Sequence, residues 1–394
     1  MVPELRRAYN AAFTEEAYRA MVAELERDSG VAIDFRISET PIFLPRELAD
    51  ELQRAAWEIF AAVTDPDYLS GAERAIPAGR GVPGDPGEPV FLQVDLALAR
   101  TAEGEIAPRL IELQAFPSLY GFQWLIARAY QRHFPAVPPD WTPYFSGLDD
   151  DTYVECLRDV IVGGAEPEQV VLLEVEPDKQ KTKVDFAVTE QLIGLRTVDA
   201  ARVERRGRGL FYRDSRGEVE IRRIYNRVIF DEVERKGIDL SHIFARDIDA
   251  EWVGHPNWFY KISKWSLPHI RSPYCPPCHF VSDLGQPPAD LENYVLKPVF
   301  SFAGLGVEVD VTAEKLSALK DPEHWILQRK VEYAPVVETP DGRAKVEMRM
   351  MFVRQAGEPR LVNSLVRTSK GKMMGVNFNR DRTWIGASVA FHPP

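Results

Sequence analysis

Two short apolar segments near residue 100 constrain the fold most, because polar side chains interrupt both at alternate positions. The polar residues are Gln93 and Asp95 in F-L-Q-V-D-L-A-L, and Glu112 and Gln114 in L-I-E-L-Q-A-F. Successive side chains of a strand point to opposite faces, so each polar pair shares one face. The apolar neighbours, with Ile111 and Leu113 among them, are expected to pack on the other face.

The segment from Thr101 to Gly104 is typical of a turn, so the two strands are expected to form a hairpin. The hairpin would bring Asp95, Glu112 and Gln114 within reach of one cation. Carboxylate and amide oxygens suit Mg²⁺, especially where phosphates of a substrate supply further ligands. The alternative is that these side chains line a solvated sheet face.

Length and charge limit the class of protein. A chain of 394 residues is long enough for two or three domains, and its formal net charge of -12 disfavours general nucleic-acid binding. Small molecules are therefore the expected partners. Neither a signal-peptide core nor a bilayer-spanning segment is evident, so we expect a cytoplasmic location and no membrane partner. No pattern predicts the oligomeric state.

The first part of the chain predicts helices over 14–28 and 46–63, followed by a loop over 76–89. Gly79, Gly81 and Gly84 in this loop have the G-x-G-x-x-G spacing of a dinucleotide-binding turn. That motif requires a helix after the glycines, which the prolines of D-P-G-E-P prevent.

Further along, helices and strands alternate between residues 150 and 203, which predicts a small α/β domain with parallel strands. An arginine-rich hairpin follows. Glutamates dilute its charge, so a solvated face is favoured over an RNA-binding surface. The last third is rich in strands joined by short turns, including G-V-E-V-D-V and W-I-L-Q-R-K-V, and predicts a mainly antiparallel sheet.

Residues 294–307 place Lys297 on a strand before a turn of Ser, Ala and Gly, an arrangement that can approach phosphate oxygens. Gln328 and Lys330 lie on a strand predicted as an edge beside a nucleotide base. Glu347 and Arg349 share a strand face. The alternative is a surface ion pair worth about 0 to 1 kcal/mol, and Arg367 could likewise be a solvated strand residue.

The order of four motifs resembles a known family. Q-V-D, I-E-L-Q-A-F-P-S-L, H-P-N-W-F-Y-K-I-S-K-W-S-L-P and L-K-P-V-F-S-F-A-G-L-G-V are similar to the synthetase part of glutathionylspermidine synthase. Those enzymes belong to the circularly permuted ATP-grasp group, as does eukaryotic glutathione synthetase. The resemblance covers roughly residues 90 to 310, with gaps.

The resemblance implies an α+β fold, a circularly permuted ATP-grasp unit with a small α/β domain inserted. The expected parts are residues 1–145 with the Mg²⁺ hairpin, 146–250 as the small domain, and 251–394 with the ATP-binding lysines. It also implies ATP-dependent ligation of a small carboxylic acid to an amine through an acyl phosphate. A nucleotide-binding protein without ligase activity is the alternative.

The family pattern assigns roles to eleven residues, and two arginines are candidates for a further role. Mg²⁺ would be held by Asp95, Glu112 and Gln114, and ATP phosphates by Lys264 and Lys297. The turn over the triphosphate would include Ser301, Ala303, Gly304 and Gly306, and the adenine would lie beside Gln328 and Lys330; Arg349 and Arg367 would stabilise the transferred phosphoryl group.

Three features of the sequence depart from the family pattern. Gln114 stands where the family has asparagine, and Gln93 stands where it commonly has an arginine, two residues before the aspartate. The role of that arginine then falls to Arg349, Arg367 or Arg80, or to no residue. The glycine turn lacks the usual Arg-Glu pair.

The segment Cys275-Pro-Pro-Cys278-His279 matches the pattern of covalent haem attachment, zinc binding or a redox pair. Haem attachment normally follows export, and the prolines oppose the helix that a thioredoxin-type pair requires. Incidental loop thiols are favoured over zinc or redox chemistry, with haem last.

Overall fold

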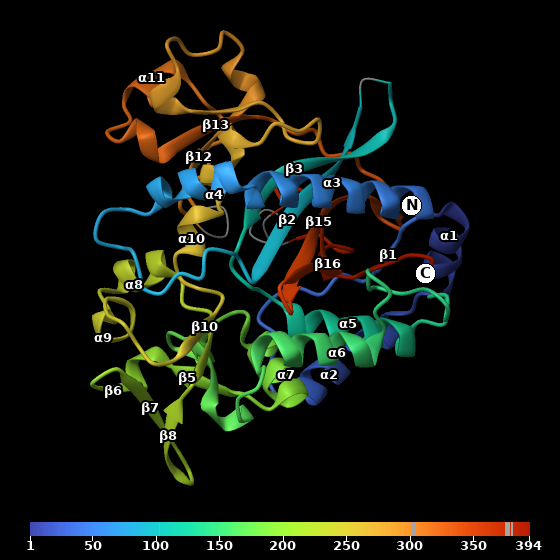
Figure 1. The fold of residues 1–394 in the computed structure, drawn as a ribbon. Coiled ribbons are helices and arrows are strands. Elements are labelled where there is room, and N and C mark those ends of the chain that lie inside the picture. Colours follow the sequence, from blue (N-terminus) through green and yellow to red (C-terminus); the bar gives the residue numbers. More distant parts are fainter. Residues whose placement is uncertain (102, 302–304, 375–378, 380) are drawn as a thin grey trace.

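The computed structural model describes residues 1–101, 103–301, 305–374, 379 and 381–394. At its centre lies an antiparallel sheet of order β17-β16-β15-β2-β3, with β14 paired to β15 (Figure 1). The strands are β2 (Phe91–Arg100), β3 (Ile106–Gln114), β14 (Val337–Thr339), β15 (Gly342–Gln355), β16 (Glu358–Ser369) and β17 (Gly386–Ser388). The predicted hairpin of β2 and β3 is therefore joined along β2 to strands from the far end of the chain.

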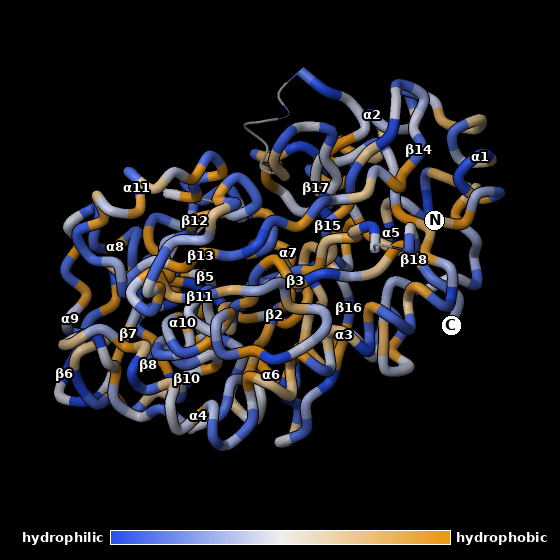
Figure 2. Tube along the Cα trace, turned by 90° about the horizontal axis from the view of Figure 1, so that it is seen from above, coloured by the Kyte–Doolittle hydropathy of each residue, from blue (hydrophilic) through white to orange (hydrophobic). Residues whose placement is uncertain are grey.

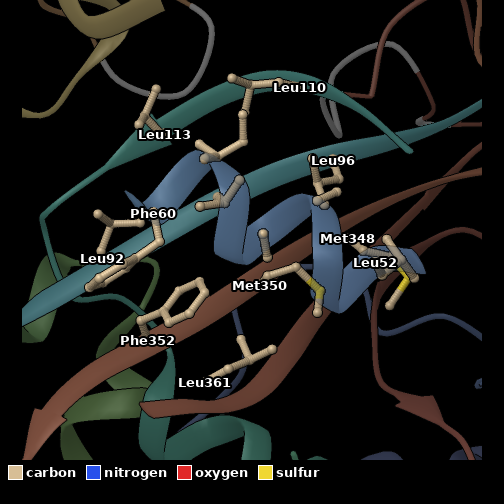
Figure 3. Close-up of a cluster of buried hydrophobic side chains, with 14 of the residues drawn as sticks. Leu52, Phe60, Leu92, Leu96, Leu110, Leu113, Met348, Met350, Phe352 and Leu361 are labelled. Carbon is tan, nitrogen blue, oxygen red and sulfur yellow. The ribbon is translucent and has the colours of Figure 1, made fainter. Parts of the chain in front are cut away.

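Helices cover both faces of this sheet. On one face α3 (Arg46–Thr64) places Leu52 and Phe60 against Leu96, Met350 and Phe352, which are almost completely buried (Figure 3). On the other face lie α5 (Tyr120–His133) and α6 (Asp150–Ile161). Each strand therefore buries alternate side chains on opposite sides. Hydrophobic residues gather along the central strands in Figure 2.

The small α/β unit contains four parallel strands in the order β10-β9-β4-β5. They are β4 (Val170–Glu174), β5 (Arg196–Asp199), β9 (Arg223–Asn226) and β10 (Glu251–Val253), with α7 (Lys183–Ile193) between the first two. The parallel pairing confirms the prediction from the alternating pattern. A separate antiparallel sheet, β6 (Glu204–Arg206), β7 (Gly209–Asp214) and β8 (Gly217–Ile221), extends from this unit. Its arginines pair with Glu204, Glu218 and Glu220.

Another three-stranded sheet has the order β11-β13-β12 and lies beside the β2–β3 hairpin (Figure 1). Its strands are β11 (Cys278–Phe280), β12 (Tyr294–Pro298) and β13 (Trp325–Arg329). The prediction that β13 is an edge strand was wrong, because the C-H-F segment pairs along its other side. Among the described residues, the predicted strand G-V-E-V-D-V forms a single bridge, between Glu308 and Leu296.

The two ends of the chain meet. β1 (Ile42–Phe43) pairs in parallel with β18 (Ala390–Phe391), and the flanking helices are α1 (Pro3–Ala12) and α2 (Glu15–Ser29). The remaining helices are α4 (Pro66–Ala72), α8 (Phe230–Lys236), α9 (Ser241–Phe244), α10 (Trp258–Lys261) and α11 (Ala313–Ser317), with a 3-10 helix η5 (Lys264–His269). Within the described ranges, every helix is too short or too polar to cross a bilayer. The mixed composition of helices and several sheets agrees with the expected α+β class.

Candidate functional site

The site begins with the register of the β2–β3 hairpin. Asp95 lies opposite Glu112, and Gln93 lies opposite Gln114. The register shifts between Asp95 and Leu96, where a bulge adds a residue to β3. As a result Leu110, rather than the predicted Ile111, packs into the core beside Leu113. The alternation of polar and apolar residues could not reveal this extra residue.

Asp95 is buried and bound by two guanidinium groups. Arg349 on β15 donates its Nε to Oδ1 at 2.6 Å and its Nη2 to Oδ2 at 2.7 Å. Arg367 on β16 donates its Nη2 to Oδ2 at 2.6 Å. Because Asp95 is only 1% exposed, its charge depends on these arginines rather than on water. Both of its oxygens are engaged in this arrangement.

Arg349 also contacts Gln93, the residue that stands where the family pattern would have an arginine. Its Nη1 lies 3.1 Å from Oε1 of Gln93, which also accepts a hydrogen bond from Gln114 at 2.8 Å. The guanidinium of Arg349 thus lies beside the side chain of residue 93. Its charge reaches this location from β15, a strand more than two hundred residues away in the sequence.

A second buried carboxylate extends the network. Glu347 binds Arg367 at 2.5 Å and accepts a hydrogen bond from the hydroxyl of Tyr333. Burial and the nearby Asp95 raise the pKa of Glu347, against the effect of Arg367. The predicted alternative of a surface ion pair between Glu347 and Arg349 is wrong, because each binds a different partner away from solvent.

Glu112 is surrounded by positive charge. Lys264 on η5 places its Nζ 3.7 Å from Oε2 of Glu112. Burial raises the pKa of Glu112, but Lys264, Lys297, Arg367 and Arg349 together lower it to about 2. The side chain of Glu112 is 30% exposed, and its carboxyl is ionised at neutral pH.

Lys297 lies on β12 with its side chain pointing toward the hairpin. It donates to the backbone oxygen of Ile111 at 3.0 Å, and burial lowers its pKa, opposed by Glu112. Lys264 donates to the backbone oxygen of Ser301 at 2.5 Å. A narrow cleft is lined by residues of β3, of η5 and of the segment after β12, among them Glu112, Gln114, Lys264 and Ser301. The hairpin, η5 and β12 therefore bring four of the predicted phosphate and metal residues to one place: Glu112, Gln114, Lys264 and Lys297.

The other predicted ATP-binding residues are distributed differently. Gln328 is buried on β13 and donates to the backbone oxygen of Leu110 at 3.3 Å. Lys330 is exposed and donates to the backbone oxygen of Glu292 at 2.5 Å. Gly306 has a left-handed φ of +73° close to Pro298, which favours glycine there. Ala303 and Gly304 lie outside the described residues.

Arg80, the third arginine considered for the phosphoryl group, is bound elsewhere. It forms an ion pair with Glu234 on α8 of the small α/β unit and is about half exposed. Arg349 and Arg367 therefore supply the arginine charge that lies next to the hairpin.

Arg227 is a feature that the sequence did not reveal. It directly follows β9, is 3% exposed, and lies over the rings of Phe116 and Phe186 at 5.0 and 5.3 Å. Its Nε and Nη1 have no hydrogen-bond partner within the described part of the chain. A buried guanidinium with unused donors is costly unless a ligand binds it.

The position of Arg227 in the sheet is informative. All four strands are parallel, but β5 lies on one side of β4, whereas β9 and then β10 lie on the other side. Open parallel sheets bind ligands at the carboxyl ends of two adjacent strands where the order switches sides in this way, here β4 and β9. At the end of β4, burial raises the pKa of Glu174 to about 8, against the charge of Arg227. Burial thus favours the neutral form of Glu174 beside Arg227. The signal available in the sequence was an arginine directly after a buried strand.

The cysteine segment offers no comparable site. Cys275 and Cys278 are free, and burial raises the pKa of their thiols to about 11 and 12. In the described ranges, no three His, Cys, Asp or Glu side chains are grouped closely enough to hold a metal ion.

The fit of the predicted Mg²⁺ ligands is uneven. Glu112 and Gln114 both line the cleft and offer oxygen atoms to a hard cation. Asp95 reaches a cation only if a guanidinium releases one of its oxygens. The metal roles of the three residues remain predictions.

Comparison with known proteins gives a fold relationship. A solved structure of a glutathione synthetase-like effector from Globodera pallida, in its apo form, matches with a TM-score of 0.59 and 13% identity, covering 98% of this chain and 97% of that chain. No family model and no curated protein matches the sequence. The fold is therefore similar to that of a glutathione synthetase-like protein along almost the whole length of both chains.

Proposed function

We propose that this protein is an ATP-dependent carboxylate-amine ligase of the circularly permuted ATP-grasp type. One observation carries the proposal: residues from three distant segments surround Glu112, namely the hairpin, η5 with β12, and the strands β15 and β16. Lysines and arginines collected around one partly buried carboxylate form a site for a metal-bound polyphosphate. The fold similarity to a glutathione synthetase-like effector supports the same class.

In this proposal the cations align and neutralise the reacting phosphate. Lys264 and Lys297 bind phosphate oxygens of ATP, and Arg349 stabilises charge on the transferred phosphoryl group from its place beside Gln93. Asp95 holds Arg349 and Arg367 in position. Mg²⁺, held by Glu112 and Gln114 and by Asp95 if a guanidinium moves, would neutralise further phosphate charge.

The acid substrate is assigned to Arg227. Its unused Nε and Nη1 each offer a hydrogen bond to a substrate oxygen, and Phe116, over whose ring the guanidinium lies, also lines the cleft. The substrate carboxylate accepts the γ-phosphoryl group of ATP, giving an acyl phosphate and ADP. An amine then attacks the acyl carbon, forming the amide and releasing phosphate and a proton. This chemistry requires no nucleophile from the protein.

The first test is binding and turnover of Mg-ATP. We expect a nonhydrolysable ATP analogue with Mg²⁺ to raise the melting temperature, and Lys297→Ala to remove the shift. Lys315→Ala, on exposed α11, is the matched control and should leave it unchanged. ADP release is then measured with panels of carboxylic acids and amines. Absence of any shift in the wild-type protein would refute nucleotide binding.

A second candidate is a nucleotide-binding protein without ligase activity. The engagement of both Asp95 oxygens by arginines favours it, because the site then lacks one predicted metal ligand. The two candidates differ in outcome. Binding of Mg-ATP without ADP release across the panels supports the second, whereas ADP release that requires both an acid and an amine supports ligation.

A further inference from the structure

A separate cavity of about 550 Å³ is lined in part by residues of η5, which also contributes to the cleft. Its walls are the end of α3, the helix α4 and the 3-10 helix η5, and none of its lining residues also lines the cleft. Ala61, Ala62 and Gly71 leave the space open on the helical side. The volume is in the range of small-molecule sites.

One wall of this cavity is aromatic. The rings of Trp265 and His269 lie 4.4 Å apart, and the ring of Tyr68 lies 6.2 Å from each of them. The Tyr68 hydroxyl is fixed by hydrogen bonds to the backbone oxygen of Lys261 at 2.7 Å and to Ser266 at 2.6 Å. This wall is suited to an aromatic or aliphatic group of a ligand.

Two arginines are held at the His269 end of the cavity. Arg74 donates its Nε to the backbone oxygen of Gly71 at 3.2 Å, and Arg271 donates its Nη1 to that of Pro268 at 2.8 Å. Burial lowers the pKa of His269, and both arginines lower it further. Within the described residues, neither guanidinium pairs with a carboxylate, so both are available to an anionic group.

Carboxylates line another part of the same cavity. They are Glu58, Asp65 and Asp67, and Asp65 is fixed by accepting the backbone N–H of Asp67 at 2.9 Å. In the described part of the chain none of the three lies within 4.0 Å of a cationic side chain. The cavity thus presents exposed charges of both signs, with no ion pair between them among the described residues.

We propose that this cavity binds a small zwitterion with an apolar side chain, of the size of a dipeptide with free termini. The ligand carboxylate binds Arg74 and Arg271, its ammonium group binds Asp65 and Asp67, and its side chain lies on Trp265. The proposal does not depend on ligase activity, because it involves none of the residues around Glu112.

The test is isothermal titration calorimetry of the full chain with the dipeptide Ala-Phe. We expect binding, and at least about tenfold weaker binding of both N-acetyl-Ala-Phe and Ala-Phe amide, each of which removes one ligand charge. The double variant Arg74→Gln with Arg271→Gln should bind Ala-Phe as weakly as the wild-type protein binds the amide. Asp65→Asn with Asp67→Asn should abolish the preference over the acetylated peptide.

Arg7→Gln with Arg19→Gln, two exposed arginines on α1 and α2, is the matched control and should bind like the wild-type protein. Circular dichroism confirms that each variant is folded. No heat of binding up to about 10 mM Ala-Phe would overturn the proposal. Equal affinity for the three peptides, or unchanged affinity in the Arg74 and Arg271 variant, would overturn it as well.

Discussion

At the scale of single residues, Asp95 shows how a buried charge depends on its partners. It accepts three hydrogen bonds from Arg349 and Arg367 and is almost inaccessible to water. Removing one member of such a group leaves the other charges buried without compensation. A residue whose only role was to bind a metal ion would have little effect on the stability of the metal-free protein.

We therefore expect Asp95→Asn to lower the free energy of unfolding by about 3 to 5 kcal/mol in the absence of metal and nucleotide. Urea denaturation followed by circular dichroism measures the change. Asp290→Asn removes a charge from an exposed ion pair with Arg329 and should change the stability far less. Equal, small effects of the two substitutions would contradict the role given to Asp95.

Glu174 gives a prediction about pH. Its pKa is about 8 in the folded protein, because burial is the largest influence on it, compared with the ordinary 4.5. Between these values the folded state holds a proton that the unfolded chain has lost. Stability from this residue therefore falls as the pH rises from 4.5 to about 8.

Glu174→Gln cannot titrate, so its stability relative to the wild-type protein should increase across this pH window. Urea denaturation at several pH values within the window measures the difference. Glu155→Gln, an exposed residue on α6, is the control and should follow the wild-type curve. Parallel curves for Glu174→Gln and the wild-type protein would show that the carboxyl titrates normally.

At the scale of elements, strand β17 depends on a glycine. Gly386 has a φ of +125°, and a Cβ there would lie 2.3 Å from the backbone oxygen of Arg36. Gly342 has almost the same φ, +126°, with open space around it. The two positions thus separate backbone strain from a collision with a neighbouring backbone segment.

We expect Gly342→Ala to lower the free energy of unfolding by about 1 to 3 kcal/mol, since only strain is involved. Gly386→Ala should cost more than that, because the segment at Arg36 must also move. Thermal and urea denaturation of both variants provide the comparison. Similar losses of unfolding free energy in the two variants would mean that the backbone segment at Arg36 moves without a cost in free energy.

The sequence was most informative about the positions of helices and strands. The helices α2, α3 and α6 and the strands β2, β3 and β15 follow from local periodicity, which depends on residues a few positions apart. Local pattern could not show that β11 would pair with β13, nor that β3 carries a bulge. Those features depend on which segments meet after folding.

The candidate site divides in the same way. Asp95, Glu112 and Gln114 were found because they interrupt apolar strands, and Lys297 because it precedes a glycine turn. The hydrogen bonds from Arg349 to Asp95 could not be predicted from the sequence, because they require knowing that β15 lies against β2. Arg227 was missed because nothing beside it in the sequence shows that its donors are unused.

At the scale of the whole molecule, the sheets differ in how well they are protected. Nine of the ten residues of β2 are buried, and β15 and β3 flank it on both sides, whereas β6, β7 and β8 form a small sheet with many exposed residues. We expect amide hydrogens of β2 to exchange only through global unfolding and those of β6 to β8 through local opening. Hydrogen exchange with mass spectrometry over a range of urea concentrations distinguishes the two. Exchange of β2 at the rate of β7 would contradict this hierarchy.

The pairing of β2 with β15 has a consequence for biosynthesis. Asp95 and Arg349 are 254 residues apart, so the acidic side chain leaves the ribosome long before the arginine that balances it has been translated. Until then the nascent hairpin has an open hydrogen-bonding edge and an apolar face, which is the kind of surface that chaperones bind. Synonymous codons that slow elongation before β15 should therefore prolong this vulnerable interval and increase aggregation, while leaving the purified protein unchanged.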